Sequence, residues 1–78
     1  MTYTVRPFTK PDLIQVSFHY DSLDEFDGDC FTVDVDDWFD QIRGADERYM
    51  YSGWIMREQT FTAMCLKWTP SKIIRLAF

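Results

Sequence analysis

The chain has 78 residues, a formal net charge of −5 and 18% aromatic residues. A chain of this length forms a single domain, 1–78, and its aromatic side chains can fill a small core, which excludes intrinsic disorder. The acidic balance argues against direct binding to nucleic acid, because such binding requires clustered Lys and Arg side chains.

Two short strands are predicted first in chain order. Residues 2–6 are rich in strand-forming side chains and end at Pro7, and residues 13–20 alternate between apolar and polar side chains. The N-terminus lacks the charged and apolar regions of a signal peptide. The longest apolar runs are far shorter than the ~20 residues needed to cross a bilayer. We therefore expect a cytoplasmic protein with no membrane partner.

The middle of the chain is predicted to hold a hairpin followed by one short helix. The sequence Asp27-Gly28-Asp29 is typical of a tight turn, and residues 30–35 alternate like a second strand. Residues 13–35 are thus expected to form a hairpin with an acidic loop. From residue 36 to 43 the apolar residues follow helical spacing, and Gly44 is suited to end that helix.

The last third is predicted to be β-structure. Residues 48–57 and 60–68 are rich in aromatic residues, Thr and Met, and residues 72–78 alternate again. Gly53, within the first of these runs, indicates either a bulge or the close approach of another backbone. The predicted fold class is α+β: an antiparallel sheet of about five or six strands with one short helix, about residues 36–43, packed on it.

Two aromatic rows on the predicted strand 48–57 leave one question open. Tyr49 and Tyr51 lie on the opposite face from Trp54 and Met56. One of these faces belongs to the core. The other is either covered by a second element or exposed as an apolar interface.

No pattern in the sequence predicts catalysis, a cofactor or a metal. Cys30 and Cys65 are expected to be small buried side chains with no disulfide, and His19 is expected on a polar strand face. These three residues are too few and too far apart to form a metal site, and the acidic loop fails the ligand spacing of an EF-hand. We expect a protein that is not an enzyme.

The acidic residues are strongly concentrated along the chain. Residues 1–20 carry a net charge of +1, residues 21–47 carry −10, and residues 48–78 carry +4. One interpretation is a solvated face that only maintains solubility. The alternative is that a block of like charges, which destabilises the compact state, exists to bind a strongly basic partner.

The second interpretation predicts a nucleic-acid decoy. Carboxylates at i and i+2 of a strand, such as Asp34 and Asp36, would project about 7 Å apart, which is about two axial rises of a DNA strand. They could occupy the phosphate sites of a basic groove, with Phe26 and Trp38 as candidate anchors. The residues predicted to bind the partner are Asp24, Glu25, Asp27, Asp29, Asp34, Asp36, Asp37 and Asp40.

In size, acidity, low cysteine content and lack of a catalytic motif, the chain resembles the phage-encoded inhibitors of bacterial defence, the anti-CRISPR and anti-restriction proteins. The resemblance covers the whole chain but rests on no shared motif. It implies inhibition by protein binding, in which the block 24–40 competes with DNA for a nuclease or a CRISPR-type surveillance complex in the cytoplasm of a host cell. The protein would act as a monomer or a small homo-oligomer.

Two other binding classes share part of this pattern. An immunity protein or antitoxin that neutralises a basic toxin would carry the same acidic block. A non-catalytic adaptor subunit would instead depend on an exposed aromatic face formed by Tyr49, Tyr51, Trp54 and Met56.

Overall fold

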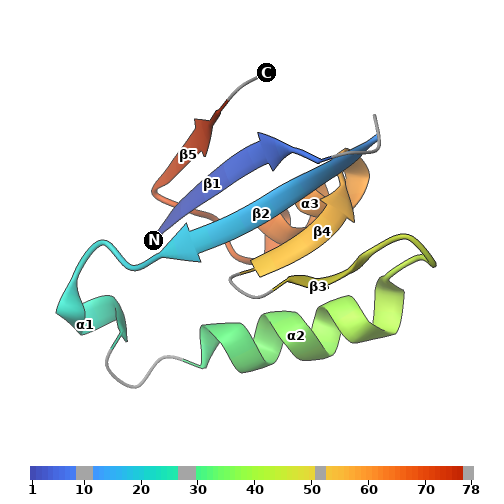
Figure 1. Ribbon diagram of the computed structural model, residues 1–78. Helices are drawn as coiled ribbons and strands as arrows, with labels where there is room; N and C mark the ends of the chain where they lie inside the picture. The colour runs from blue at the N-terminus through green and yellow to red at the C-terminus, as the bar shows by residue number, and fades with distance from the viewer. Residues whose placement is uncertain (9–11, 27–29, 51–52, 77–78) are drawn as a thin grey trace.

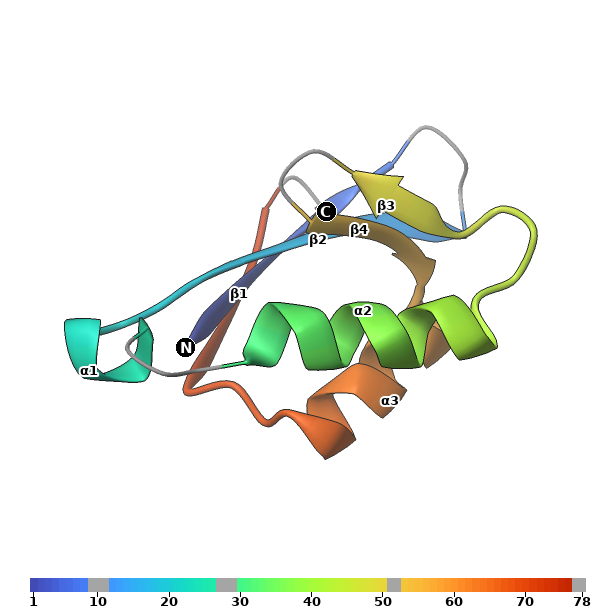
Figure 2. The same ribbon diagram turned by 90° about the horizontal axis from the view of Figure 1, so that it is seen from below.

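The computed structural model describes residues 1–8, 12–26, 30–50 and 53–76. Within these ranges the protein is an α+β domain with a five-stranded sheet in the order β3-β4-β2-β1-β5. Helices α2 and α3 both lie against one face of the sheet, and α1 lies beyond the N-terminal end of α2 (Figures 1 and 2). The predicted fold class is therefore confirmed. The elements are β1 (Thr2–Pro7), β2 (Leu13–His19), α1 (Leu23–Phe26), α2 (Phe31–Ile42), β3 (Arg48–Met50), β4 (Gly53–Arg57), α3 (Glu58–Lys67) and β5 (Lys72–Arg75).

The sheet is mostly antiparallel, with one parallel pair at an edge. Strands β1 and β2 pair antiparallel with Val5 opposite Val16, and β2 pairs antiparallel with β4, where Val16 faces Trp54. β3 and β4 form a further antiparallel pair, while β5 runs parallel to β1. The parallel pair corrects the expectation of a wholly antiparallel sheet. It arises because α3 stands between β4 and β5 and carries the chain to the far edge.

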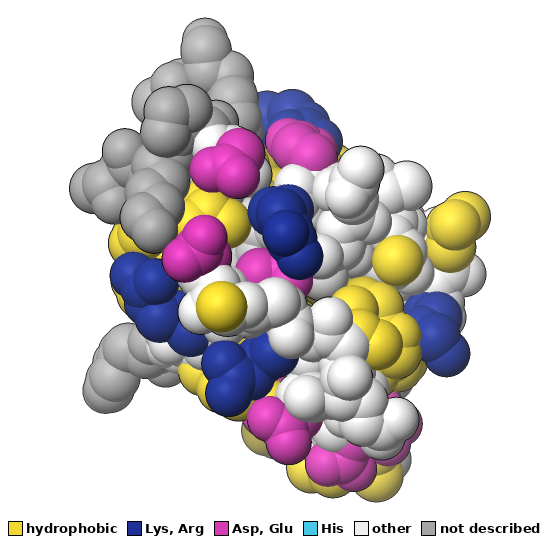
Figure 3. Space-filling view, turned by 90° about the vertical axis from the view of Figure 1, so that its right-hand side faces the viewer, with side chains coloured by type: hydrophobic (Ala, Val, Ile, Leu, Met, Phe, Trp, Pro, Cys, Tyr) yellow, Lys and Arg dark blue, Asp and Glu magenta, His cyan; other side chains and the backbone are white. Residues whose placement is uncertain are grey.

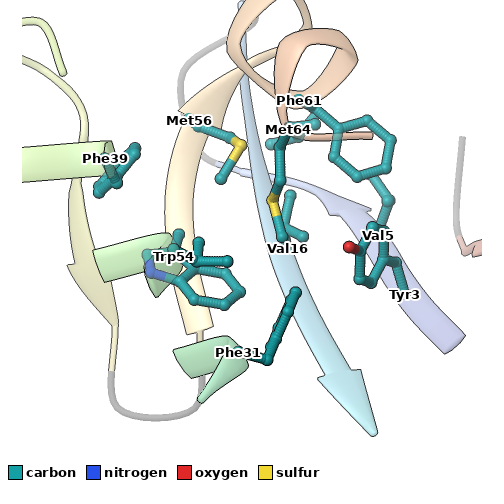
Figure 4. Packing of buried hydrophobic residues seen from close by; sticks show 11 residues of the cluster. Tyr3, Val5, Val16, Phe31, Phe39, Trp54, Met56, Phe61 and Met64 are labelled. Atoms are coloured by element: carbon teal, nitrogen blue, oxygen red, sulfur yellow. The ribbon is translucent and has the colours of Figure 1, made fainter. Parts of the chain in front are cut away.

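The core lies between the sheet and the two helices. The alternation of β2 is as predicted, because Ile14 and Val16 are buried and Phe18 packs against the same cluster. Figure 4 shows side chains from both layers converging on this core. The buried cluster comprises Tyr3, Val5, Ile14, Val16, Phe31, Val35, Phe39, Trp54, Met56, Phe61 and Met64.

The predicted hairpin over residues 13–35 is wrong, because residues 31–42 form the single helix α2. Its buried residues, Phe31, Val35 and Phe39, recur every four positions. The apparent strand period relied on Val33, which is 62% exposed. The short helix predicted over 36–43 is the C-terminal part of this longer helix. The turn predicted at 27–29 lies outside the described residues.

The predicted strand over residues 60–68 is also wrong, since α3 occupies Glu58–Lys67. Thr60, Phe61 and Met64 are buried at helical spacing, whereas strand propensity alone favoured a strand. The predicted strand 48–57 is in fact the β3–β4 pair. A Cβ on Gly53 would lie 2.0 Å from the Val16 carbonyl oxygen, which confirms the close backbone approach that the sequence suggested there.

Candidate functional site

Helix α2 carries three exposed residues of the acidic block. Asp34, Asp37 and Asp40 are exposed and follow one another at i, i+3 and i+6, a spacing that puts successive Cβ atoms about 5–6 Å apart. Asp40 is paired only loosely, since its Oδ1 lies 3.6 Å from Nε of Arg43. The strand spacing predicted for Asp34 and Asp36 is wrong, because both residues lie on the helix. The acidic surface is therefore a helical one.

Apolar side chains are interleaved with these acids. Val33, Asp37 and Asp40 stand at i, i+4 and i+7, so they share the face of α2 turned away from the buried Phe31–Val35–Phe39 face. On α1, Asp24 is exposed between Leu23 and Phe26, which are exposed as well. We call Val33, Asp34, Asp37 and Asp40, together with Leu23, Asp24 and Phe26, the acidic helical surface.

The two predicted anchors differ in exposure. Phe26 is exposed, and its ring packs edge-to-face with the ring of Tyr20, with 5.5 Å between the ring centroids. Trp38 is half-buried and packs against the core. Its ring packs edge-to-face with that of Trp68, with 5.5 Å between the ring centroids. Phe26 is thus available to a partner, whereas Trp38 mainly holds α2 and the end of α3 together.

Glu25 belongs to a clamp on the N-terminal ammonium group. The Met1 nitrogen donates to Asp21 Oδ2 at 2.8 Å and to both Glu25 carboxylate oxygens at 2.7 and 2.8 Å. Asp21 also accepts a hydrogen bond from the hydroxyl of Ser71. Hydrogen bonds from the ammonium group lower the pKa of Asp21 and Glu25, and the same bonds raise the pKa of the N-terminus. Glu25 therefore stabilises the fold by holding the N-terminus against α1.

Asp36 is half-buried and directed toward the sheet. Its Oδ1 accepts a hydrogen bond from Trp54 Nε1 at 2.8 Å, and its backbone carbonyl accepts one from the Tyr49 hydroxyl at 2.9 Å. The indole nitrogen of Trp54, blue in Figure 4, lies on the side of the ring nearest α2. Asp36 thus connects α2 to the β3–β4 pair. Asp27 and Asp29, the other two predicted site residues, lie outside the described residues.

An open groove of about 500 Å³ lies between α2 and the β3–β4 pair. It is lined by the aromatic residues Phe18, Tyr49 and Trp54 and by Asp36, together with Thr32, Met50 and Gly53. Tyr49 is 42% exposed, while Trp54 and Met56 are buried at 2% and 0%. Trp54 and Met56 therefore belong to the core. Of the predicted aromatic rows only Tyr49 is exposed in the described part, because Tyr51 lies outside it.

The basic side chains lie mainly on the other elements. Every Asp and Glu of the described residues lies in a helix or a connecting segment, whereas the strands hold Arg6, Arg48, Arg57, Lys72 and Arg75. The register aligns Arg6 with Gln15, Ile55 and Arg48 in one row on the face opposite the helices. Figure 3 views the molecule from the right-hand side of Figure 1 and shows Lys and Arg side chains mixed with Asp and Glu, with further Asp and Glu side chains at the lower edge, where α2 lies in Figure 1.

The histidine and the two cysteines, the remaining candidates for a reactive or metal-binding site, do not come together. His19 is exposed, as predicted. Both cysteines are free, but Cys30 is exposed and Cys65 half-buried, so their expected full burial is wrong. They fall at the start of α2 and within α3, where the sequence predicted strands. Within the described ranges, no three His, Cys, Asp or Glu side chains come close enough together to hold a metal ion.

No protein family, curated protein or solved structure matches this chain. Among the helices that the structure describes, none has both the length and the apolar character required to cross a membrane. Function is therefore inferred from the acidic helical surface and the groove beside it.

Proposed function

We propose that this protein is a non-catalytic inhibitor that binds the basic, nucleic-acid-binding surface of another protein through its acidic helical surface. The supporting observation is the face of α2 on which Val33, Asp37 and Asp40 are exposed together. Val33 is exposed among the acids of α2, and Leu23 and Phe26 are exposed beside Asp24 on α1. Exposed apolar side chains surrounded by charges are typical of protein interfaces.

The target is a protein that binds DNA or RNA, such as a nuclease or a CRISPR-type surveillance complex in the cytoplasm. Surfaces rich in Lys and Arg commonly serve to bind phosphates, and a row of carboxylates can compete for the same side chains. Opposite charge also speeds the encounter between two proteins. Arg6 and Arg48, on the opposite face of the sheet, do not oppose this contact, because they point away from the helices.

The test is capture of a partner from a bacterial lysate with three proteins: the wild type, the Asp34→Lys/Asp37→Lys/Asp40→Lys variant, and Asp12→Lys. Asp12 is exposed outside the acidic helical surface, so its reversal is a control for charge alone. We expect the wild type and Asp12→Lys to retain a basic nucleic-acid-binding protein, and the triple variant to lose it.

Competition decides whether the contact is a decoy for nucleic acid. Added DNA or RNA should displace the captured protein, because both would occupy one basic surface, and moderate salt should weaken the complex. A ternary complex with nucleic acid bound would contradict the proposal. So would a triple variant that still captures the same partner.

The immunity-protein alternative predicts the same contacts with a toxin as the partner, so the identity of the captured protein distinguishes it. The adaptor alternative has less support, because Trp54 and Met56 are buried in the core.

A further inference from the structure

The groove between α2 and the β3–β4 pair combines aromatic walls with a carboxylate. Tyr49 stands directly opposite Trp54 in the sheet register, on the face that α2 covers, and Phe18 contributes a third ring. The groove opens beside the acidic helical surface, because Asp36 lies three residues after Val33 and four before Asp40, spacings that make neighbours on the surface of a helix. A partner docked on that surface would reach the groove.

Asp36 carries a charge that the fold does not require. Among the side chains that the structure describes, Trp54 alone donates to this carboxylate, at Oδ1, although a carboxylate can accept about four hydrogen bonds. An asparagine would accept the same bond from the indole through its amide oxygen. The negative charge, half-buried and facing the groove, is therefore available to a ligand.

The ring of Tyr49 already accepts a guanidinium group. Arg43 places its guanidinium carbon 6.0 Å from the ring centroid, a cation–π distance. The Tyr49 hydroxyl is fixed by its bond to the Asp36 carbonyl, so the ring is held beside the carboxylate. A second guanidinium entering the groove would meet a pre-positioned ring and a carboxylate acceptor.

These groups favour one kind of occupant. A guanidinium is planar, stacks on aromatic rings and donates two parallel hydrogen bonds to a carboxylate. An ammonium group is compact and strongly hydrated, and a neutral apolar group would leave the Asp36 charge partly desolvated with no donor. We propose that this groove receives an arginine side chain from the basic surface of the partner. The inference rests on the proposed function for the source of the arginine, but the groove can be tested without that partner.

The probes are N-acetyl-arginine amide, its neutral isostere N-acetyl-citrulline amide, and N-acetyl-lysine amide. The readout is the indole N–H resonance of Trp54, assigned with Trp38→Phe and Trp68→Phe variants. The arginine derivative should shift this resonance saturably, with weak affinity. The citrulline and lysine derivatives should bind about tenfold more weakly, because one lacks the charge and the other the planar fork.

Asp36→Asn should reduce arginine binding to the citrulline level while the indole hydrogen bond persists. Asp34→Asn removes the same charge from the same helix outside the groove, so it should change the affinity by no more than about twofold in moderate salt. A citrulline or lysine derivative that binds the groove as tightly as the arginine derivative would overturn the assignment. Equal loss in Asp34→Asn and Asp36→Asn, or no loss in Asp36→Asn, would also overturn it.

Failure of the groove and failure of the proposed function give different results. If arginine does not bind but the α2 charge reversals still abolish partner capture, only the groove assignment fails. If arginine binds in the groove but those reversals leave capture unchanged, the acidic decoy fails and the arginine site stands.

Discussion

The carboxylate of Glu47, which is 1% exposed, accepts hydrogen bonds from both the backbone N–H and the guanidinium of Arg57, at 3.0 and 3.2 Å. The backbone N–H of Gly44 donates to the same carboxylate at 2.8 Å. Burial by itself would raise the pKa of Glu47, but the hydrogen bonds from Thr60, Gly44 and Arg57 outweigh it and lower that pKa. One side chain thus ties the end of α2 to the junction of β4 and α3.

Replacing Glu47 by Gln should destabilise the protein by about 2–3 kcal/mol. The amide group would present donors where the native carboxylate accepts them, which leaves at least one buried N–H without an acceptor. Urea denaturation followed by tryptophan fluorescence measures the change. Asp37→Asn removes an exposed charge and should stay within about 0.5 kcal/mol of the wild type. A Glu47→Gln variant as stable as Asp37→Asn would show that this carboxylate is not a structural hub.

The bond from Trp54 to Asp36 gives a second stability prediction. Asp36→Ala removes the acceptor of an indole N–H in a side chain that is 2% exposed, and should cost about 1–2 kcal/mol. Asp36→Asn keeps an acceptor oxygen and should cost less than about 0.5 kcal/mol. The free energies of unfolding of the two variants provide the check. Equal losses would mean that the charge, and not the hydrogen bond, carries the stability.

Local pattern predicted much of the sheet and the class of fold. The alternation in residues 13–20 is genuine because β2 lies in the middle of the sheet with one face on the core. The same alternation in residues 30–35 gave a wrong prediction, because the four-residue spacing of Phe31 and Val35 places them on one face of either a strand or a helix. Burial of Phe39, four positions further on, favours the helix, and a window of six residues could not show this.

The candidate site was predictable only in part, for the same reason. A count of charges found the acidic block, and Asp34, Asp37 and Asp40 remain exposed. The count could not tell these acids from those that serve the fold, because the partners of the latter are distant in sequence. Glu25 binds Met1, Asp36 binds Trp54 and Glu47 binds Arg57, contacts that form only when the sheet and helices assemble.

Gly53 provides a test of the strand packing. An alanine there would place its Cβ 2.0 Å from the Val16 carbonyl oxygen, in the backbone of the neighbouring central strand. Because neither strand can move freely, Gly53→Ala should cost about 2–3 kcal/mol. At Gly44 the nearest atom to a new Cβ is the Arg57 guanidinium nitrogen at 2.7 Å, the end of a flexible side chain, so Gly44→Ala should cost less. A reversed order in thermal or urea denaturation would contradict this packing.

The clamp of Asp21 and Glu25 on the Met1 ammonium should make stability depend on pH at both ends of the neutral range. Since the folded pKa of each carboxyl is lowered, their contribution is present above their ordinary values of 3.8 and 4.5 and is lost as the pH falls. Since the folded pKa of the ammonium group is raised, its contribution is full below its ordinary value of 8.0 and is lost as the pH rises above it.

Thermal denaturation between pH 3 and pH 10 should therefore show a plateau between about pH 5 and 8. The Asp21→Asn/Glu25→Gln variant should have a shallower alkaline decline, because the contribution of the ammonium group is lost, while Cys65, Tyr3 and Tyr49, whose pKa values burial raises, keep part of it. Its acid decline should also be shallower but should not vanish, because Glu47, whose pKa is lowered, still contributes there. An alkaline decline as steep in the variant as in the wild type would rule out the clamp as its cause.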